Sequence, residues 1–292
     1  MARVAIVGVG AIGGVTAGLL KQAADHQLLL CMRRAMPGLS IDTPDGLVSV
    51  DATFITNPSQ AFEVDWVIVA TKAYDVAGAA KWLESLCSNG APVAVLQNGV
   101  EHQERFAPYV PLERILPVMV DCPVERQALD TIRQRGGMHL KVPDSALGRS
   151  FVNLFAGTTA DANTVPDFKS VVWRKLCFNS AGVLSALVLQ PAGVVRGKSI
   201  GDVALQIIRE CAAVARAEGA NLEENVADLV LAAQRAAPPD SVNSMLADRQ
   251  AGRPVEIDAR NGVIVRLGRK HGIATPANSM AVALMEAMVA KP

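Results

Sequence analysis

Cysteine and histidine are sparse in this sequence and nowhere clustered. The 292 residues include five cysteines and four histidines, with no Cys-x-x-Cys pair. Zinc sites need several such ligands at short spacings, so we expect no metal ion. Scattered cysteines are typical of a reducing compartment and not of a disulfide-stabilised secreted domain. The sequence therefore predicts a cytoplasmic protein.

An excess of charge of either sign is also missing. The 28 basic and 28 acidic residues cancel, which argues against binding to nucleic acid or to a membrane surface. The residues before Gly8 are too few for a signal peptide. Residues 176–195 carry no charge and are long enough to raise the question of a membrane span. We expect a buried helix there instead, because polar residues and a proline interrupt the run: Asn179, Ser180, Ser185, Gln190 and Pro191.

Apolar residues make up half of the chain, which is enough for two hydrophobic cores at this length. Up to Val165, short apolar strands alternate with helical patterns, as in a doubly wound parallel sheet. Beyond Pro166 the strand patterns stop and helical patterns dominate. We predict an α/β protein with a Rossmann-type doubly wound sheet over residues 1–165 and an all-α C-terminal domain over residues 166–292.

The individual elements follow from the same periodicities. We expect strands at residues 3–7, 27–32, 47–55, 65–70, 92–96 and 113–120, and a hairpin at residues 132–142. We expect a first helix from the glycine-rich stretch to Ala24, and further helices at residues 75–87, 168–189, 199–218, 222–236, 241–250, 254–270 and 276–290.

A glycine motif follows the first expected strand. The stretch Gly8-Val-Gly10-Ala-Ile-Gly13 is G-x-G-x-x-G between a strand and a helix, the context that dinucleotide binding requires. Gly8 permits a tight turn, Gly10 lets the backbone approach a pyrophosphate, and Gly13 lets the helix pack closely. Free N–H groups at the start of the helix can then bind the phosphates. The motif predicts a dinucleotide cofactor.

Arg33 and Arg34 follow the second expected strand. An NAD-binding protein normally has an acidic residue here, about twenty residues after the glycines, to hold the ribose hydroxyls. Guanidinium groups instead can bind a 2′-phosphate bidentately. We therefore predict NADP as the cofactor, with a solvated basic corner as the alternative interpretation of the two arginines.

Lys72 and Asn98 follow two further expected strands. The carboxyl ends of parallel strands line the ligand crevice of an open α/β sheet. Both residues are therefore candidates for cofactor or substrate contacts. A solvated loop lysine and a turn-forming Asn-Gly are the alternatives, and the sequence does not separate them.

The helical half contains a second group of candidates. Lys175 lies at the edge of the long apolar run. A lysine amine in apolar surroundings resists protonation, so its pKa can fall toward the range that is useful for proton donation. Asn179 lies one turn later on the same helix face. Ser244 lies where a helix begins, and Glu256 lies four residues before Arg260. The alternatives are an edge lysine with its amine in water, a simple helix cap and a surface ion pair.

Taken together, these stretches resemble the ketopantoate reductase (2-dehydropantoate 2-reductase) family over nearly the whole chain. The stretches that carry the resemblance are Gly8-Val-Gly-Ala-Ile-Gly13, Thr71-Lys72-Ala73, Gln97-Asn98-Gly99, Trp173-Arg-Lys175 with Asn179, Ser244-Met245-Leu246, Glu256-Ile-Asp258 with Asn261-Gly262, His271-Gly-Ile273, and Thr275-Pro276.

The resemblance implies NADPH-dependent reduction of a 2-oxo acid, 2-dehydropantoate or a related one, to the 2-hydroxy acid, as in pantothenate biosynthesis. It implies that residues 1–165 bind NADP and that residues 166–292 bind substrate and carry the catalytic residues. Lys175 then donates the proton to the carbonyl oxygen, and Glu256 lies near the nicotinamide ribose and the substrate. The implied cofactor-binding residues are Gly8, Val9, Gly10, Ala11, Ile12, Gly13, Arg33, Lys72, Asn98 and Glu256. The implied substrate-binding residues are Asn98, Lys175, Asn179 and Ser244.

The sequence departs from the family pattern at two positions. Val183 and Gly193 stand where the family has asparagine, so two polar substrate contacts are missing. Each buried partner left unpaired would weaken binding of a polyhydroxylated acid by about 1–3 kcal/mol, or the pocket could accept a more apolar 2-oxo acid. An NADP-linked β-hydroxy acid dehydrogenase and a non-catalytic NADP-binding protein remain as alternatives. The expected partner is a small molecule, and a homodimer is the assembly that we consider.

Overall fold

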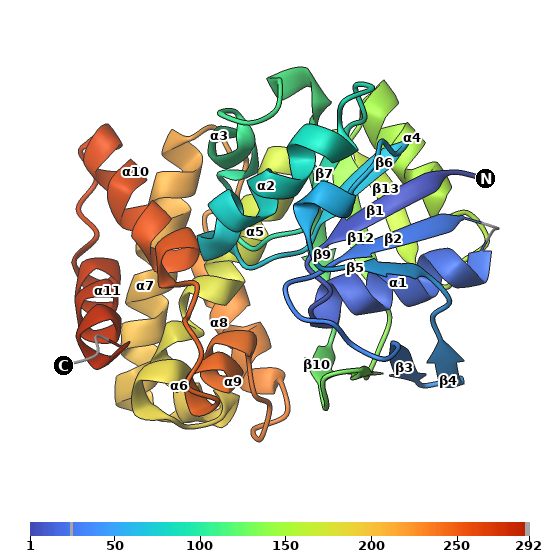
Figure 1. The fold of residues 1–292 in the computed structure, drawn as a ribbon. Helices are drawn as coiled ribbons and strands as arrows, with labels where there is room; N and C mark the ends of the chain where they lie inside the picture. The colour runs from blue at the N-terminus through green and yellow to red at the C-terminus, as the bar shows by residue number, and fades with distance from the viewer. Residues whose placement is uncertain (24–25, 290–292) are drawn as a thin grey trace. The chain divides into compact units, whose positions relative to one another are not determined.

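Two compact units make up the chain, Met1–Phe168 and Lys169–Pro292. The computed structural model, drawn in Figure 1, describes residues 1–23 and 26–289. The boundary falls close to Pro166, where the strand patterns of the sequence stop. The predicted helix ends at Ala24 and Ala290 lie outside the described residues.

A parallel sheet forms the centre of the first unit. Its six strands have the order β5-β2-β1-β6-β7-β8, and every neighbouring pair is parallel. This confirms the predicted doubly wound fold. The order reverses between β1 and β6, and ligands of such sheets bind beyond the carboxyl ends of the strands at this point. The strands are β1 (Arg3–Val7), β2 (Gln27–Cys31), β5 (Thr53–Ile55), β6 (Trp66–Val69), β7 (Val93–Val95) and β8 (Ile115–Pro117).

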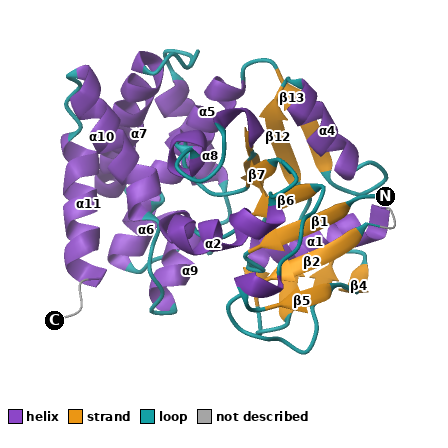
Figure 2. Ribbon diagram, turned by 45° about the horizontal axis from the view of Figure 1, so that its top comes forward, coloured by secondary structure: helices purple, strands orange, loops and turns teal. Residues whose placement is uncertain are grey.

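Helices pack on both faces of this sheet (Figure 2). They are α1 (Ala11–Ala23), α2 (Val76–Leu86), α3 (His102–Phe106) and α4 (Ala146–Leu154), with the short turns η1 (Pro58–Gln60), η2 (Ala73–Asp75) and η3 (Leu112–Arg114). On β1, Val4 and Ile6 face the core that includes α1 and α4, whereas Ala5 and Val7 face the core that includes α2 and α3. A strand buried on both faces has an uninterrupted apolar sequence, which is why β1 could be predicted.

Some strand predictions in this unit are wrong. Residues 47–55 form two strands, β4 (Gly46–Ser49) and β5. The strand β4 pairs antiparallel with β3 (Ser40–Thr43), whereas β5 joins the parallel sheet. Residues 113–120 are likewise divided between β8 and β9 (Met119–Asp121), which lie in different sheets.

The predicted hairpin at residues 132–142 is also wrong. Here β11 (Thr131–Gln134) pairs with β3 and with β10 (Val124–Arg126), while β12 (His139–Pro143) pairs with β9 and with β13 (Asp161–Val165). Apolar alternation identifies a strand but does not name its partner, because pairing depends on residues far away in the chain.

The regular structure of the second unit, in the part that is described, is helical. This agrees with the predicted all-α C-terminal half. Its helices are α5 (Phe168–Ser180), α6 (Val183–Val188), α7 (Lys198–Ala217), α8 (Val226–Ala236), α9 (Ser244–Gln250), α10 (Val263–His271) and α11 (Pro276–Val289), with the 3₁₀ turn η4 (Ala192–Arg196) and the π-helical turn η5 (Asp258–Gly262).

The apolar run of the sequence forms α5 and α6 and not one helix as predicted. The chain turns at Ala181 and Gly182, where the Gly182 N–H donates to the Asn179 carbonyl at 3.1 Å. By length and composition Phe168–Val188 could cross a membrane, but 56% of its most apolar window is buried inside the protein. Burial of this kind is typical of a core helix in a globular unit.

The carboxylate of Glu210, on α7, caps α11 inside the second unit. The residue is only 4% exposed. Its two oxygens accept hydrogen bonds from the backbone N–H groups of Ala277 and Asn278, both at 2.9 Å, and from Asn278 Nδ2 at 2.7 Å. The first N–H groups of a helix have no partner within it and carry partial positive charge, so a carboxylate there is stabilised. Glu210 therefore fastens α11 to α7.

We predict that Glu210→Gln lowers the free energy of unfolding by about 1–3 kcal/mol, because an oxygen acceptor becomes an NH₂ group that faces buried N–H donors. Urea unfolding followed by circular dichroism measures the change. The control is Glu224→Gln, which replaces an exposed glutamate of the same unit. Equal unfolding midpoints for the two variants would contradict the prediction.

Candidate functional site

The glycines after β1 have three different surroundings. Gly8 has a φ of +96°, and an added Cβ there would lie 2.7 Å from the backbone nitrogen of Thr71. At Gly13 an added Cβ would lie 2.2 Å from the Gly8 carbonyl oxygen, so α1 lies too close to the turn after β1 for a side chain. Around Gly10, apart from its neighbours in the chain, no atom of the described residues lies within 4 Å of such a Cβ. The first and third glycines thus serve packing, whereas the second leaves open space beside the backbone.

The rest of the motif forms the start of α1. Ala11 and Ile12 are the first residues of α1, whose initial N–H groups have no helical partner and favour an anion. The carbonyl of Val9 accepts a hydrogen bond from the guanidinium of Arg126, on β10, which also donates to the Leu129 carbonyl. No motif surrounds Arg126 in the sequence, so its contact with the glycine turn was missed.

Arg33 lies just beyond the carboxyl end of β2. Its side chain is 83% exposed, and its Nη1 lies 3.4 Å from Oδ2 of Asp75. An ion pair this exposed contributes little to stability. The structure therefore keeps the guanidinium accessible at the position where an NAD-binding protein has its ribose-binding acid.

Lys72 and Asn98 follow neighbouring parallel strands, β6 and β7. Both are half-buried. Gln97 connects the two loops, since its Nε2 donates to Thr71 Oγ1 at 3.0 Å and to the Lys72 carbonyl at 3.3 Å. The structure thus brings the loops of these two predicted site residues together. Gln97 itself was not predicted, because a glutamine at the end of a strand has no distinctive signal.

His102 holds the backbone of Gln97 in place. It is 4% exposed, and its Nε2 lies 2.8 Å from the Gln97 carbonyl oxygen, to which it donates when that nitrogen carries the proton. Burial lowers the pKa of His102, although its hydrogen bond to Gln97 opposes that effect. The imidazole is therefore a neutral structural donor to the residue that precedes Asn98.

In the second unit, Lys175 and Asn179 lie one turn apart on α5, and both are half-buried. The end of this helix is tied to the start of α9, because Asn243 Nδ2 donates to the Gly182 carbonyl at 3.0 Å. Asn243 also caps α9 by accepting from the N–H groups of Met245 and Leu246, both at 3.0 Å. The cap is thus Asn243, which leaves the side chain of Ser244 for another role.

Ser244 and Glu256 both interact with a buried arginine. Arg260, on η5, donates from Nη2 to Ser244 Oγ at 2.7 Å. Burial lowers the pKa of Arg260, and the charges of Glu256 and Asp248 oppose that effect. Arg260 is 4% exposed and Glu256 is 5% exposed, so the alternative of a surface ion pair is wrong. The sequence spacing indicated the pair but not its burial.

Asn261 links this cluster to α5. Its Nδ2 donates to the Ser180 carbonyl at 3.0 Å and to Asn278 Oδ1 at 2.9 Å, and it is fully buried. The successive residues Arg260 and Asn261 therefore hold α9 and the end of α5. The elements that carry Asn179, Ser244 and Glu256 are joined by hydrogen bonds within one unit.

The two positions that depart from the family pattern are both packed. Val183, the first residue of α6, is fully buried. At Gly193 an added Cβ would lie 2.8 Å from the Pro239 carbonyl oxygen and 2.9 Å from Pro239 Cβ. Neither position offers a polar side chain, and at Gly193 any side chain requires the backbone to move.

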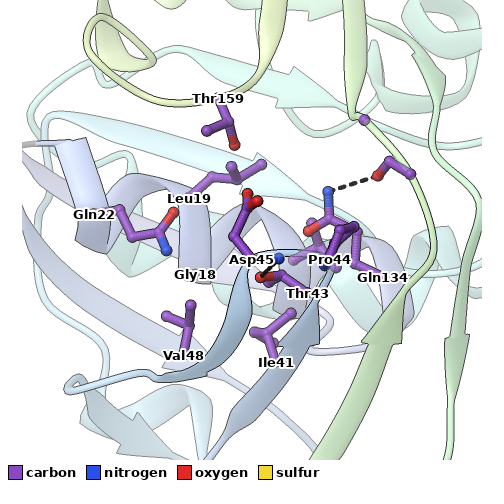
Figure 3. Close-up of a pocket in the computed structure, with 13 residues that line it drawn as sticks. Gly18, Leu19, Gln22, Ile41, Thr43, Pro44, Asp45, Val48, Gln134 and Thr159 are labelled. Carbon is purple, nitrogen blue, oxygen red and sulfur yellow. Dashed lines mark hydrogen bonds between the residues drawn. The ribbon is translucent and has the colours of Figure 1, made fainter.

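A pocket of about 160 Å³ lies elsewhere in the first unit, between α1 and the strands β3, β4 and β11 (Figure 3). Gly18, Gln22, Thr43 and Gln134 are among its lining residues. The hydroxyl of Thr43 donates to Gly46 O, and the amide of Gln134 donates to Gly136 O. None of the predicted site residues lines this pocket, and these polar groups bind the protein itself.

The pKa of His102 leads to a prediction about pH. A histidine whose pKa is lowered by folding binds more protons in the unfolded state, so its contribution is complete above the ordinary value of about 6.5 and is lost as pH falls toward the folded pKa. Unfolding free energies of the wild type and His102→Gln, measured by urea from pH 5 to 8, should therefore converge as pH falls. A constant difference over this range would count against a neutral buried His102.

The comparisons with known proteins cover both units. The family described as "Ketopantoate reductase PanE/ApbA" matches residues 4–146, and "Ketopantoate reductase PanE/ApbA C terminal" matches residues 167–289. A 2-dehydropantoate 2-reductase of Caulobacter vibrioides is 46% identical, over 98% of this chain and 99% of the relative. A 2-dehydropantoate 2-reductase of Mycobacterium tuberculosis is 40% identical, over 97% of each chain. The crystal structure of a PanE/ApbA family ketopantoate reductase from Ralstonia eutropha JMP134 has a TM-score of 0.89 at 30% identity and covers 98% of both chains. The chain therefore belongs to the ketopantoate reductase family of oxidoreductases.

Proposed function

We propose that the protein reduces a 2-oxo acid to the 2-hydroxy acid with NADPH. The observation that carries this proposal is the cluster in the second unit, where Ser244 and Glu256 meet at Arg260 and the end of α5 is tied to the same elements. The relatives named above are 2-dehydropantoate 2-reductases, so 2-dehydropantoate is the first substrate to test.

Lys175 is the proposed proton donor. As the carbonyl is reduced, negative charge develops on its oxygen, and an ammonium both stabilises that charge and supplies the proton. NADPH supplies the hydride when it is bound. Half-burial of Lys175 favours this role because charge is screened less away from bulk water.

The substrate carboxylate needs hydrogen-bond donors. We assign these to the Ser244 hydroxyl and the Asn179 amide, which belong to elements joined through Asn243. In this proposal Asn98 also contacts the substrate, and Glu256 contacts the nicotinamide ribose and the substrate.

The first unit fits a dinucleotide phosphate. The space beside Gly10 and the N–H groups of Ala11 and Ile12 at the start of α1 suit the pyrophosphate. We assign the 2′-phosphate of NADP to Arg33, and further cofactor contacts to Lys72 and Asn98. Residues 1–165 are then the NADP-binding domain and residues 166–292 the substrate and catalytic domain.

The packing at Val183 and Gly193 bears on the choice of substrate. Without polar side chains at these positions the site has fewer groups to bind substrate hydroxyls. We therefore include apolar 2-oxo acids as candidates beside 2-dehydropantoate. A cytoplasmic location and a homodimer complete the proposal.

We predict that Lys175→Ala lowers kcat by about 10²–10⁴-fold, the usual contribution of a general acid, while NADPH still binds. The assay is NADPH oxidation at 340 nm across a panel of 2-oxo acids that includes 2-dehydropantoate, with cofactor binding measured by fluorescence titration. Lys198→Ala serves as the control, because Lys198 is an exposed lysine of the same unit paired with Asp202. Full turnover by Lys175→Ala would eliminate Lys175 as the donor, and binding without turnover by the wild type would eliminate the proposed reaction.

We predict that Arg33→Ser raises the KM for NADPH by about 10–100-fold and leaves the KM for NADH nearly unchanged, since only the 2′-phosphate loses a charge-assisted hydrogen bond. Initial rates with both cofactors give the comparison. Arg149→Ser, which removes an exposed arginine on α4, is the matched control. An equal rise in KM for both cofactors would show that Arg33 does not bind the 2′-phosphate.

A further inference from the structure

Arg260 is a buried cation that the proposed reaction does not itself use. It is 4% exposed and lies among Ser244, Glu256 and Asp248. Both carboxylates are also buried, at 5% exposure each. A guanidinium this deeply buried is rare unless opposite charges surround it. The two carboxylates thus explain how the charge of Arg260 is tolerated, but not why an arginine is present.

One donor of Arg260 has no hydrogen-bond partner among the described residues. Its Nε is fully buried and makes no hydrogen bond. Leaving a buried donor unsatisfied is unfavourable, and apolar residues can replace buried ion pairs with little loss of stability. Arg260 is therefore a poor choice for stability alone, so its contact with Ser244 indicates a role in the site.

The direction of the hydrogen bond to Ser244 restricts what that residue can do. A serine hydroxyl has one hydrogen and two acceptor lone pairs, whereas arginine has donors only. At 2.7 Å, Arg260 must therefore use Ser244 as the acceptor. The hydrogen of Ser244 is then directed away from Arg260. Because Ser244 is exposed whereas Arg260 is buried, that hydrogen can serve an acceptor that arrives from outside.

The backbone around Arg260 strengthens this interpretation. Arg260 lies on the π-helical turn η5, and each turn of a π-helix contains an additional residue. The next residue, Asn261, is held by the Ser180 carbonyl and by Asn278. The Arg260 backbone is therefore anchored independently of Ser244, which lets its guanidinium set the position of the hydroxyl.

We propose that Arg260 is a positioning residue for substrate recognition: it fixes the Ser244 hydroxyl as a hydrogen-bond donor to the carboxylate of the 2-oxo acid. The inference rests on the proposed function, because it needs Ser244 to contact the substrate. The positive charge behind the hydroxyl also polarises its O–H bond toward an anionic acceptor.

A double-mutant cycle on KM tests the inference. Arg260→Met should raise the KM for the 2-oxo acid about tenfold, as expected for a lost hydrogen bond to a charged group. The KM for NADPH and kcat should stay within about twofold, because only carboxylate binding is affected. In a Ser244→Ala background the same substitution should add less than about a twofold rise, because the hydroxyl on which it acts is gone.

Arg260→Lys keeps the cycle informative if Arg260→Met does not fold. It retains a positive charge between Glu256 and Asp248 but lacks the planar guanidinium that orients the hydroxyl. It should raise the KM for the 2-oxo acid several-fold with Ser244 present, and leave it unchanged in the Ser244→Ala background. Arg269→Met, which replaces an exposed arginine on α10, is the control and should alter neither KM.

The outcomes separate the inference from the proposed function. Rises in KM that multiply in the double variant would show that Arg260 acts independently of Ser244 and would overturn the inference alone. The inference also fails if the KM for NADPH rises as much as that for the 2-oxo acid and the melting temperature falls, since that pattern indicates a merely structural role. Absence of turnover by the wild type on every 2-oxo acid would overturn the proposed function, and the inference with it.

Discussion

The hydrogen bonds of Asn261 are the interaction on which the helical unit depends. From one buried amide nitrogen they reach the last turn of α5 and the side chain of Asn278. Asn278 continues to Glu210 and to the Ile207 carbonyl, at 2.7 and 3.1 Å. These hydrogen bonds connect four segments of the second unit in its buried interior, where an unpaired polar group is costly.

This network explains why the chain forms a π-helical turn at Asp258–Gly262. An ordinary helix has 3.6 residues per turn, and the additional residue of a π turn changes which side chains share a face. The turn contains both Arg260 and Asn261, whose side chains bond to α9 and to the end of α5. The irregularity therefore lies where two neighbouring side chains must bind different elements.

The features that could be predicted from the sequence are the local ones. The strand β1, the glycine turn and α1 follow one another directly, so their signal is contained in a short stretch, and the surroundings of Gly8 and Gly13 agree with it. The division into a sheet-containing half and a helical half could likewise be predicted from periodicity.

What could not be predicted depends on distant contacts. The helix ends before Gly182 within an uncharged run of the sequence, and the Gly182 carbonyl accepts a hydrogen bond from Asn243, 61 residues away. The spacing of Arg260 from Glu256 is typical of a helix surface, yet both residues are buried. The same dependence on distant contacts explains why β11 and β12 belong to separate sheets. Burial and strand partnership are properties of the assembled fold and leave little trace in a single stretch.

The contact between Gly193 and Pro239 limits how this family member can change. A side chain at Gly193 would collide with backbone atoms, not with the flexible end of another side chain. The Gly193 N–H also donates to the Pro239 carbonyl at 2.9 Å, so the two segments are joined as well as close. A polar group at this position therefore requires the 238–240 segment to be rebuilt at the same time. Evolution toward or away from an asparagine here would proceed by coupled changes in two loops, and sequence variation at the two sites should be correlated.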